Sequence, residues 1–441
     1  MAVDRSFPPP VSDFGDFCLN VPSPITLSNG MKMWIASNGE EEINKLNIYM
    51  TGGAFQETHP AQATACSMAV FNGNAQMSFA EIAEAIDFYG AWRTAQVYDN
   101  STAFSLASLN GNFDKTLPIF IESLRTPVFP EDEFETLKRQ LAVSCAMARE
   151  KVKYIANKEI MKLYYGESHP LATDPTPEDI NSLTLEHMRY FHSNFYKAQN
   201  CNIVFAGNIS DKEIATVENV IGEWIPDGDA TPQVEPPFCP SHKMFKIVDK
   251  QGAVQSAIMM MLKTVPRQHP HYFKLRILAT SLGGYFGSRL MKNIREDKGY
   301  TYGINASHSG RAFDGYLAIA TECDTCHTWD VIDETHNEIN RLRDKLIPQQ
   351  ELETVKRYML SDLAKTLDTP FNIAAYIGNM FCYGTYPSYF NEQVQEIKNV
   401  TSSQLQDIAQ QYLDIAKLRT VIVCDKNLLP KNNKNNNLNL F

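Results

Sequence analysis

The sequence predicts an α+β protein of two homologous domains, each a mostly antiparallel sheet with helices packed on one face. Three observations support this prediction. The chain has 441 residues, which is too long for one ordinary hydrophobic core. It repeats itself weakly at an offset of about 217 or 218 residues. In both copies, strand-like segments alternate with helix-like segments, a pattern typical of helices layered on an antiparallel sheet.

Four pairs of segments carry the repeat, and they occur in the same order in both halves of the chain. The pairs are Pro130–Leu141 with Pro348–Met359, Tyr165-Gly166 with Tyr383-Gly384, Ile180–Thr184 with Ile397–Thr401, and Cys201–Asn208 with Arg419–Lys426. We therefore divide the chain into an N-terminal extension, a first domain, a linker rich in Pro, Gly and acidic residues, a second domain, and an Asn-rich tail expected to be disordered. Their bounds are 1–19, 20–225, 226–243, 244–427 and 428–441.

Hydrophobic spacing places the elements within each domain. In the first domain, residues 45–53 alternate like a half-buried strand, and residues 78–90 predict a helix that Ser78 caps and Gly90 ends. The other elements expected there are a strand at 102–110, a helix at 114–127 and a long helix at 129–152. The second domain repeats the order, with strands at 256–263, 301–308 and 315–322 and helices at 273–282 and 329–344.

Composition excludes several classes of protein. Apolar residues make up 44% of the chain and charged residues 21%, as in soluble globular proteins. The net charge of −11 argues against a nucleic-acid partner, and no apolar run approaches the length of a membrane span. The first residues lack the basic segment and apolar core of a signal peptide. The nine scattered cysteines predict free thiols in a reducing compartment, so we expect a cytoplasmic protein.

The most informative stretch is 282–302, which reads LGGYFGSRLMKNIREDKGYTY. Its glycine pair interrupts a helix that restarts at Ser288, and Gly299 then leads into a strand. Arg295 precedes Tyr302 by seven residues across this turn, a spacing suited to holding a peptide backbone. The stretch resembles the second-domain signature of the pitrilysin/insulinase-type zinc peptidases, or inverzincins, which include the mitochondrial processing peptidase. The resemblance covers the chain outside both termini. It implies that family's duplicated fold and a contact of Arg295 and Tyr302 with the substrate carbonyl region.

Active members of this family carry H-x-x-E-H on a first-domain helix, followed by a distant glutamate, to bind zinc and activate water. Alignment to the family places Thr64, Ser67 and Met68 at the His, Glu and His positions of the motif. The family spacing places Cys145 at the third ligand position, and Glu150 is the nearest acid downstream. Hydroxyl and thioether groups are poor zinc ligands, and no nearby carboxylate can act as the general base. The resemblance therefore implies a degenerate zinc site and no metal in this chain.

Other motifs have simpler structural explanations. Cys323–His327 fits the C-x-x-C-H pattern of haem attachment, but no export signal precedes it, so we expect a structural loop. His187 and His192 lie about 140° apart around a helix and have no evident third ligand. The glycine pair lacks the G-x-G-x-x-G pattern of a nucleotide-binding loop. Thr94 occupies the position where active family members have an asparagine beside the zinc.

The resemblance implies a non-catalytic, substrate-binding subunit of a heterodimeric zinc metallopeptidase. A paralogue with H-x-x-E-H would supply the zinc, and this chain would supply Arg295 and Tyr302 to grip peptide substrates. Alone, the chain is expected to be an inactive pseudoenzyme without a cofactor, and neither nucleic acid nor membrane is an expected partner. Two alternatives stay open. One is an inactive homologue that serves as a scaffold in a larger assembly, as the core subunits of the respiratory bc1 complex do. The other is an active zinc peptidase with relocated ligands.

Overall fold

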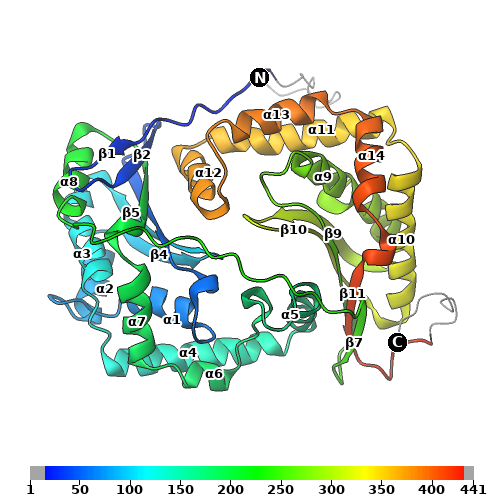
Figure 1. Cartoon of the computed structure of the whole chain (residues 1–441), viewed down its shortest axis with the longest axis horizontal. Helices are drawn as coiled ribbons and strands as arrows, with labels where there is room; N and C mark the ends of the chain where they lie inside the picture. Colours follow the sequence, from blue (N-terminus) through cyan, green and yellow to red (C-terminus); the bar gives the residue numbers. More distant parts are fainter. Residues whose placement is uncertain (1–14, 432–441) are drawn as a thin grey trace, which may run out of the picture.

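A computed structural model describes residues 15–431, so residues 1–14 of the expected extension and 432–441 of the expected Asn-rich tail lie outside the described residues. The described chain forms two sheets, one in each half of the molecule (Figure 1). In spatial order, the first sheet contains β1 (Ile25–Thr26), β2 (Lys32–Ser37), β6 (Cys201–Gly207), β3 (Ile43–Thr51), β5 (Ser101–Leu109) and β4 (Trp92–Val97). The second contains β7 (Phe245–Asp249), β11 (Arg419–Cys424), β8 (Gln255–Lys263), β10 (Gly315–Asp324) and β9 (Thr301–Gly310).

The two sheets share one topology. In each sheet a single parallel pair joins an early strand to the last strand of the same half, β2 with β6 and β7 with β11. All the other pairings among the described strands are antiparallel. The predicted fold class of two mostly antiparallel sheets with packed helices is therefore confirmed.

The sequence repeat corresponds to equivalent helices in the two halves. Helices α4 (Glu131–Arg149) and α11 (Gln349–Ala364) begin in the first matched pair of segments, each directly after a proline. Another matched pair contains the N-caps of α7 (Leu185–Phe195) and α14 (Ser402–Tyr412). The cap hydroxyls of Thr184 and Thr401 accept hydrogen bonds from free backbone N–H groups in the first turns of these helices. The matched segments of the repeat therefore mark equivalent helix starts in the two halves.

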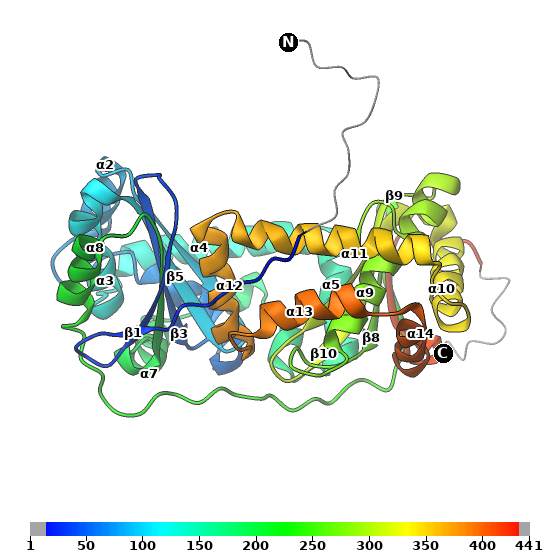
Figure 2. The same cartoon turned by 90° about the horizontal axis from the view of Figure 1, so that it is seen from above.

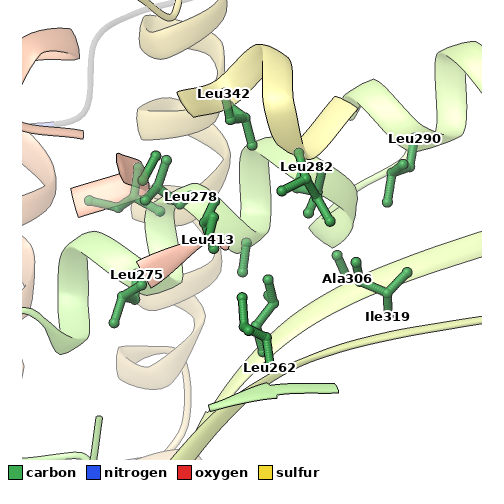
Figure 3. Close-up of a cluster of buried hydrophobic side chains, with 14 of the residues drawn as sticks. Leu262, Leu275, Leu278, Leu282, Leu290, Ala306, Ile319, Leu342 and Leu413 are labelled. Carbon is green, nitrogen blue, oxygen red and sulfur yellow. The ribbon is translucent and has the colours of Figure 1, made fainter. Parts of the chain in front are cut away.

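Most helices cover one face of the sheet in their own half. The other helices of the first half are α1 (Gln62–Ala69), α2 (Phe79–Phe88), α3 (Phe113–Arg125), α5 (Val152–Tyr165), α6 (Pro177–Asn181) and α8 (Asp211–Ile221). Those of the second half are α9 (Tyr272–Ala279), α10 (Thr328–Asp344), α12 (Pro370–Tyr383) and α13 (Tyr389–Asn399). In the second half, leucine and isoleucine side chains from the sheet and its helices meet in one core (Figure 3). This core includes Leu262, Leu275, Leu278, Leu282, Ile319 and Leu342.

Two helices cross over to cover the remaining face of the other half's sheet. Helix α5 belongs to the first half by sequence, yet Ile160 packs with Met259 and Val421 of the second sheet. Helix α12 belongs to the second half, yet Ile377 packs with Val204 of the first sheet. Figure 1 shows α5 beside β7 and β11 and α12 beside the first sheet. Both crossing helices end at the repeated Tyr-Gly pair, so the exchange follows the same two-fold repeat as the sheets.

Polar contacts also join the two halves. Arg311, from the turn between β9 and β10, pairs with Asp99 of the first half. The Tyr165 hydroxyl donates to Asp314 at 2.8 Å, and the Tyr164 hydroxyl donates to the Gly315 carbonyl at 2.8 Å. The linker after α8 runs as an extended segment along one side of the molecule (Figure 2).

The N-terminal segment is part of this inter-half contact. Asn391 of α13 exchanges two hydrogen bonds with the backbone of Leu19, at 2.9 and 3.0 Å. Leu19 is 5% exposed and belongs to the second-half core. Residues expected to form a simple extension before the first domain therefore pack against the second half.

Two predicted elements differ in detail. The long helix expected at 129–152 ends at Arg149, and α5 begins at Val152 after a short break at Glu150 and Lys151. This break lets α5 turn toward the second sheet. The helix expected at 273–282 ends as a π-helical turn, Thr280–Gly284, and restarts after Ser288 as the sequence indicated.

No helix within residues 15–431 is long and apolar enough to cross a membrane.

Candidate functional site

Helix α1 carries the three residues that the sequence alignment assigns to the metal-binding motif. Thr64 is exposed, whereas Ser67 is 2% exposed and its hydroxyl donates to the Thr64 carbonyl at 2.9 Å. Met68 is 42% exposed. The Ser67 hydroxyl is therefore committed to the helix backbone, and Met68 supplies only a neutral thioether. These side chains do not fit a zinc ion, which requires three protein ligands from imidazole, thiolate or carboxylate groups.

The remaining predicted position, Cys145, lies on α4 and is also committed. Its thiol donates to the Pro175 carbonyl at 3.1 Å, and burial raises its pKa, so the neutral thiol is favoured. Glu150 forms an ion pair with Lys250 of the second half instead of turning toward α1. Within residues 15–431, no group of three or more His, Cys, Asp or Glu side chains is placed to hold a metal.

The histidines near α1 do not converge. The His187 ring lies tilted against the His59 ring, with 4.8 Å between the ring centroids, and His59 Nε2 hydrogen-bonds the Ser182 hydroxyl at 2.9 Å. His192 points elsewhere, because its Nε2 bonds the Leu124 carbonyl at 2.7 Å. The two histidines of the H-x4-H pair therefore contact two separate regions of the first half, His59 and the Leu124 carbonyl.

A half-buried carboxylate supports the start of α1. Glu57 accepts a hydrogen bond from the Ala63 backbone N–H at 2.8 Å, and burial raises its pKa to about 7. The residue before the helix, Ala61, has a left-handed backbone with φ of 64°, so the helix starts without an ordinary side-chain cap. Glu57 therefore takes the place of an N-cap for this short helix.

We expect Glu57→Gln to flatten the pH dependence of stability. A carboxyl whose pKa rises from its ordinary value of 4.5 to about 7 on folding binds more protons in the folded chain than in the unfolded chain. The contribution of Glu57 to the free energy of unfolding therefore falls as pH rises from 4.5 to 7 and is constant above that. The glutamine would keep the hydrogen bond without the buried charge, so the variant should be more stable than the wild type at pH 8 by on the order of 1–3 kcal/mol. Urea unfolding at pH 5 and pH 8 measures this difference, with the exposed Glu84→Gln as control. A variant that loses stability equally at both pH values would contradict this expectation.

A groove runs beside α1 and the free edge of the first sheet. Its volume is about 540 Å³, and its lining residues include Ser67, Met68, Phe71, Trp92, Arg93 and Thr94. Among the described strands, β4 pairs only with β5, so its outer edge has free backbone N–H and C=O groups. Trp92 is 67% exposed, and the Arg93 guanidinium lies 5.0 Å from the Phe71 ring centroid. An extended peptide can pair with such an edge.

The second candidate site lies at the start of β9. A bulge places Tyr302 and Gly303 together opposite Glu322, because Thr301 pairs with Cys323 and Ile304 pairs with Thr321. The Thr301 hydroxyl stabilises the bulge by donating to the Glu322 carbonyl at 2.6 Å. The Tyr302 side chain is 93% exposed at the sheet edge.

Arg295 is fixed next to this tyrosine. It lies in a π-helical turn, Met291–Asp297, and its Nε donates to the Tyr302 carbonyl at 3.0 Å. Its guanidinium also lies 4.5 Å from the Phe286 ring centroid, and Phe286 is 61% exposed. The terminal guanidinium nitrogens have no hydrogen-bond partner among residues 15–431. The structure therefore brings the two predicted residues into contact at an open surface and adds Phe286, which the sequence did not single out.

A close backbone contact sets the position of this turn. A Cβ atom on Gly283 would lie 2.6 Å from the Ala306 backbone nitrogen of β9, so only glycine fits there. The segment that carries Phe286 and Arg295 is thereby held against β9.

The C-x-x-C-H segment is structural, although Cys323 lies in β10 instead of a loop. Burial raises the pKa of the Cys323 thiol to about 12. His327, in the short 3₁₀ turn Thr325–His327, stacks on Tyr300 with 4.3 Å between ring centroids. These contacts attach the turn to the segment that leads into Tyr302.

The sequence of this chain is similar to those of known peptidase-like proteins. Residues 182–359 match the family model described as the peptidase M16 inactive domain. An "uncharacterized zinc protease" of Bacillus subtilis is 24% identical over 391 residues, covering 88% of this chain and 94% of that protein. A "non-peptidase homolog" of Helicobacter pylori is 22% identical over 330 residues, covering 71% of this chain and 72% of that protein.

Solved structures share the whole fold. A peptidase M16 inactive domain from Pseudomonas fluorescens superposes with a TM-score of 0.83 at 23% identity, covering 92% of this chain and 98% of that chain. A chain of "Complex III2 from Candida albicans" superposes with a TM-score of 0.73 at 16% identity, covering 92% and 97%. The fold is therefore that of M16-like peptidases, and the side chains predicted at its zinc positions are not zinc ligands. Residues 182–359 and the whole fold are similar to those of M16-like peptidases, which confirms the resemblance recognised in the sequence.

Proposed function

We propose that this chain is the substrate-binding, non-catalytic partner of a zinc-bearing relative in a heterodimeric peptidase that acts on peptides. The observation that carries the proposal is the surface pair of Arg295 and Tyr302. One nitrogen of Arg295 is held by the Tyr302 carbonyl, and the other nitrogens remain available to a ligand. A rigid donor of this kind suits the carbonyl oxygen of a bound peptide, especially when that oxygen gains negative charge.

The groove beside β4 supports the same proposal. A peptide added to the free edge of β4 would gain backbone hydrogen bonds without a sequence-specific requirement. The exposed Trp92 and Met68 offer apolar contact to its side chains. In this proposal the chain binds and orients the peptide, and the zinc-bearing partner supplies the hydrolytic chemistry.

The test is to purify the chain alone and after co-expression with an H-x-x-E-H relative, and to assay cleavage of an unfolded peptide. We expect the lone chain to contain far less than one zinc per chain by elemental analysis and to show no chelator-sensitive cleavage. The pair should cleave faster than the partner alone. Strong chelator-sensitive cleavage by the lone chain would reject the proposal and favour relocated ligands.

A second candidate function is a scaffold role, favoured by the similarity to a chain of the Complex III2 structure. In that case the chain would enter a stable assembly without changing any partner's peptidase activity. Co-purification followed by the same cleavage assay separates the two functions, because only the first predicts faster cleavage by the pair.

A further inference from the structure

A second hollow lies in the second half of the molecule, away from the bulge at Tyr302. It has a volume of about 290 Å³ between α9, β9, α12 and α13. Its lining residues include Arg267, Arg276, His308, Tyr376, Asn379 and Gln393. Guanidinium, imidazole, phenol and amide groups from separate elements therefore converge on one small volume.

Two guanidinium groups line this hollow, and the charge of Glu392 also acts on its Tyr376 hydroxyl. Within residues 15–431, neither Arg267 nor Arg276 forms an ion pair. The Arg267 Nε donates to the Gly310 carbonyl at 3.1 Å, and its guanidinium lies 4.0 Å from the Tyr383 ring centroid, so its position is fixed. The nearby carboxylate of Glu392 instead accepts hydrogen bonds from Tyr386 at 2.6 Å and from Ser388 at 2.7 Å. Further along the same helix, Glu396 pairs with Lys274.

Two buried polar atoms in the hollow have no partner among the described residues. They are His308 Nδ1 and the Tyr376 hydroxyl. The other ring nitrogen of His308, Nε2, hydrogen-bonds the Thr264 hydroxyl at 2.8 Å. Burial lowers the pKa of His308 to about 3, with a further contribution from Arg276 and Arg267, so the ring is neutral at physiological pH. When Nε2 accepts from Thr264, Nδ1 carries the hydrogen and becomes a free donor. An unpaired buried donor is costly, and an acceptor in the hollow would remove that cost.

We propose that this hollow binds a phosphate group, either free or carried by a small molecule. Two guanidinium groups match the charge of a phosphate dianion, and planar N–H pairs match its oxygens. His308 Nδ1 and the Tyr376 hydroxyl supply two neutral donors for the remaining oxygens. A carboxylate carries one charge on two oxygens and would leave part of this donor set unused. The site is independent of the proposed peptide-binding function, and the failure of either leaves the other in place.

The test is isothermal titration calorimetry on the full chain, at constant ionic strength, with inorganic phosphate, glycerol phosphate and succinate as three separate ligands. We expect one saturable phosphate site per chain. Tighter binding of glycerol phosphate would assign a phosphorylated small molecule, and tighter binding of inorganic phosphate would assign the free ion. Both results support the site. No saturable binding of either phosphate, or equally tight binding of succinate, would overturn the proposal.

Variants locate the binding. Arg276→Gln should weaken phosphate binding by about 10-fold or more, because it removes a charge-assisted pair of hydrogen bonds. Tyr376→Phe removes one hydroxyl and keeps the ring, so it gives an independent test if Arg276→Gln does not fold. The exposed Arg139→Gln on α4 is the matched control and should bind as the wild type does. This location would be rejected if the Tyr376→Phe variant bound phosphate as tightly as the wild type and the Arg276→Gln variant, where it folds, did the same.

Discussion

Arg295→Ala should lower the turnover of the assembled peptidase by about 10²-fold, the usual cost of removing one donor to a developing oxyanion. This expectation rests on the proposed heterodimer. The loss should appear in kcat, because the peptide groove beside β4 remains intact. The free energy of unfolding should fall by about 1–2 kcal/mol, because half-buried Arg295 loses its hydrogen bond to the Tyr302 carbonyl and its contact with Phe286. Steady-state cleavage by the co-purified pair measures the first quantity, and urea unfolding of the chain measures the second.

Three further variants separate chemistry from structure. Lys292→Ala changes an exposed cation near Arg295 on the same helical segment, and it should leave turnover unchanged. Arg295→Lys keeps the charge but loses the planar donor pair, so it should restore only part of the activity. Tyr302→Phe tests the phenol of a side chain that is 93% exposed. Unchanged turnover of the Arg295→Ala pair would assign Arg295 a structural role in holding Tyr302.

Ile377→Ala should destabilise the chain by about 2–5 kcal/mol, the range for truncating a fully buried isoleucine. Ile377 is 0% exposed and contacts the first sheet, although it belongs to the second half by sequence. Ile160→Ala, at the equivalent crossing helix α5, should have a similar cost because that side chain is also 0% exposed. Urea unfolding measures both values.

Backbone amide hydrogen exchange shows which strands each of these two substitutions destabilises. Ile377→Ala should speed the exchange of backbone amides in β6 of the first half, and Ile160→Ala should do so in β8 and β11 of the second half. The exposed Ile225→Ala is the matched control and should leave both unchanged. Faster exchange confined to the mutated residue's own half would show that the crossing helices contribute little to the opposite sheets.

Local signals were strong enough to predict the element types. The Ser78 side chain caps α2, as the sequence indicated, and the structure adds a reciprocal hydrogen bond with Glu81. Alternating apolar residues identified β3, although both of its faces are covered: Leu46 belongs to the first-half core, and Tyr49 packs in the cluster with α12. The sequence also singled out Arg295 and Tyr302 together, and the structure adds the hydrogen bond from Arg295 to the Tyr302 carbonyl.

Long-range features were not predictable in the same way. A helix that crosses to another sheet has the same amphipathic pattern as one that stays, so nothing in α5 or α12 identified its partner. The bulge at Tyr302 depends on the register between β9 and β10, and pattern alone does not specify the register of an edge strand. The basic hollow joins residues from position 267 to position 393, and no short motif links them.

The sequence by itself predicted the two mostly antiparallel sheets, because the hydrophobic patterns and turn residues that specify them lie close together along the chain. The assignment of Thr64, Ser67, Met68 and Cys145 to zinc-site positions stays a prediction of the sequence. The tertiary structure decided which face each helix covers, where Tyr302 points and which charges gather in one hollow. Those outcomes depend on burial and on contacts between residues far apart in sequence. Several arrangements satisfy the local conformational preferences equally well, and the free energy of packing selects one of them.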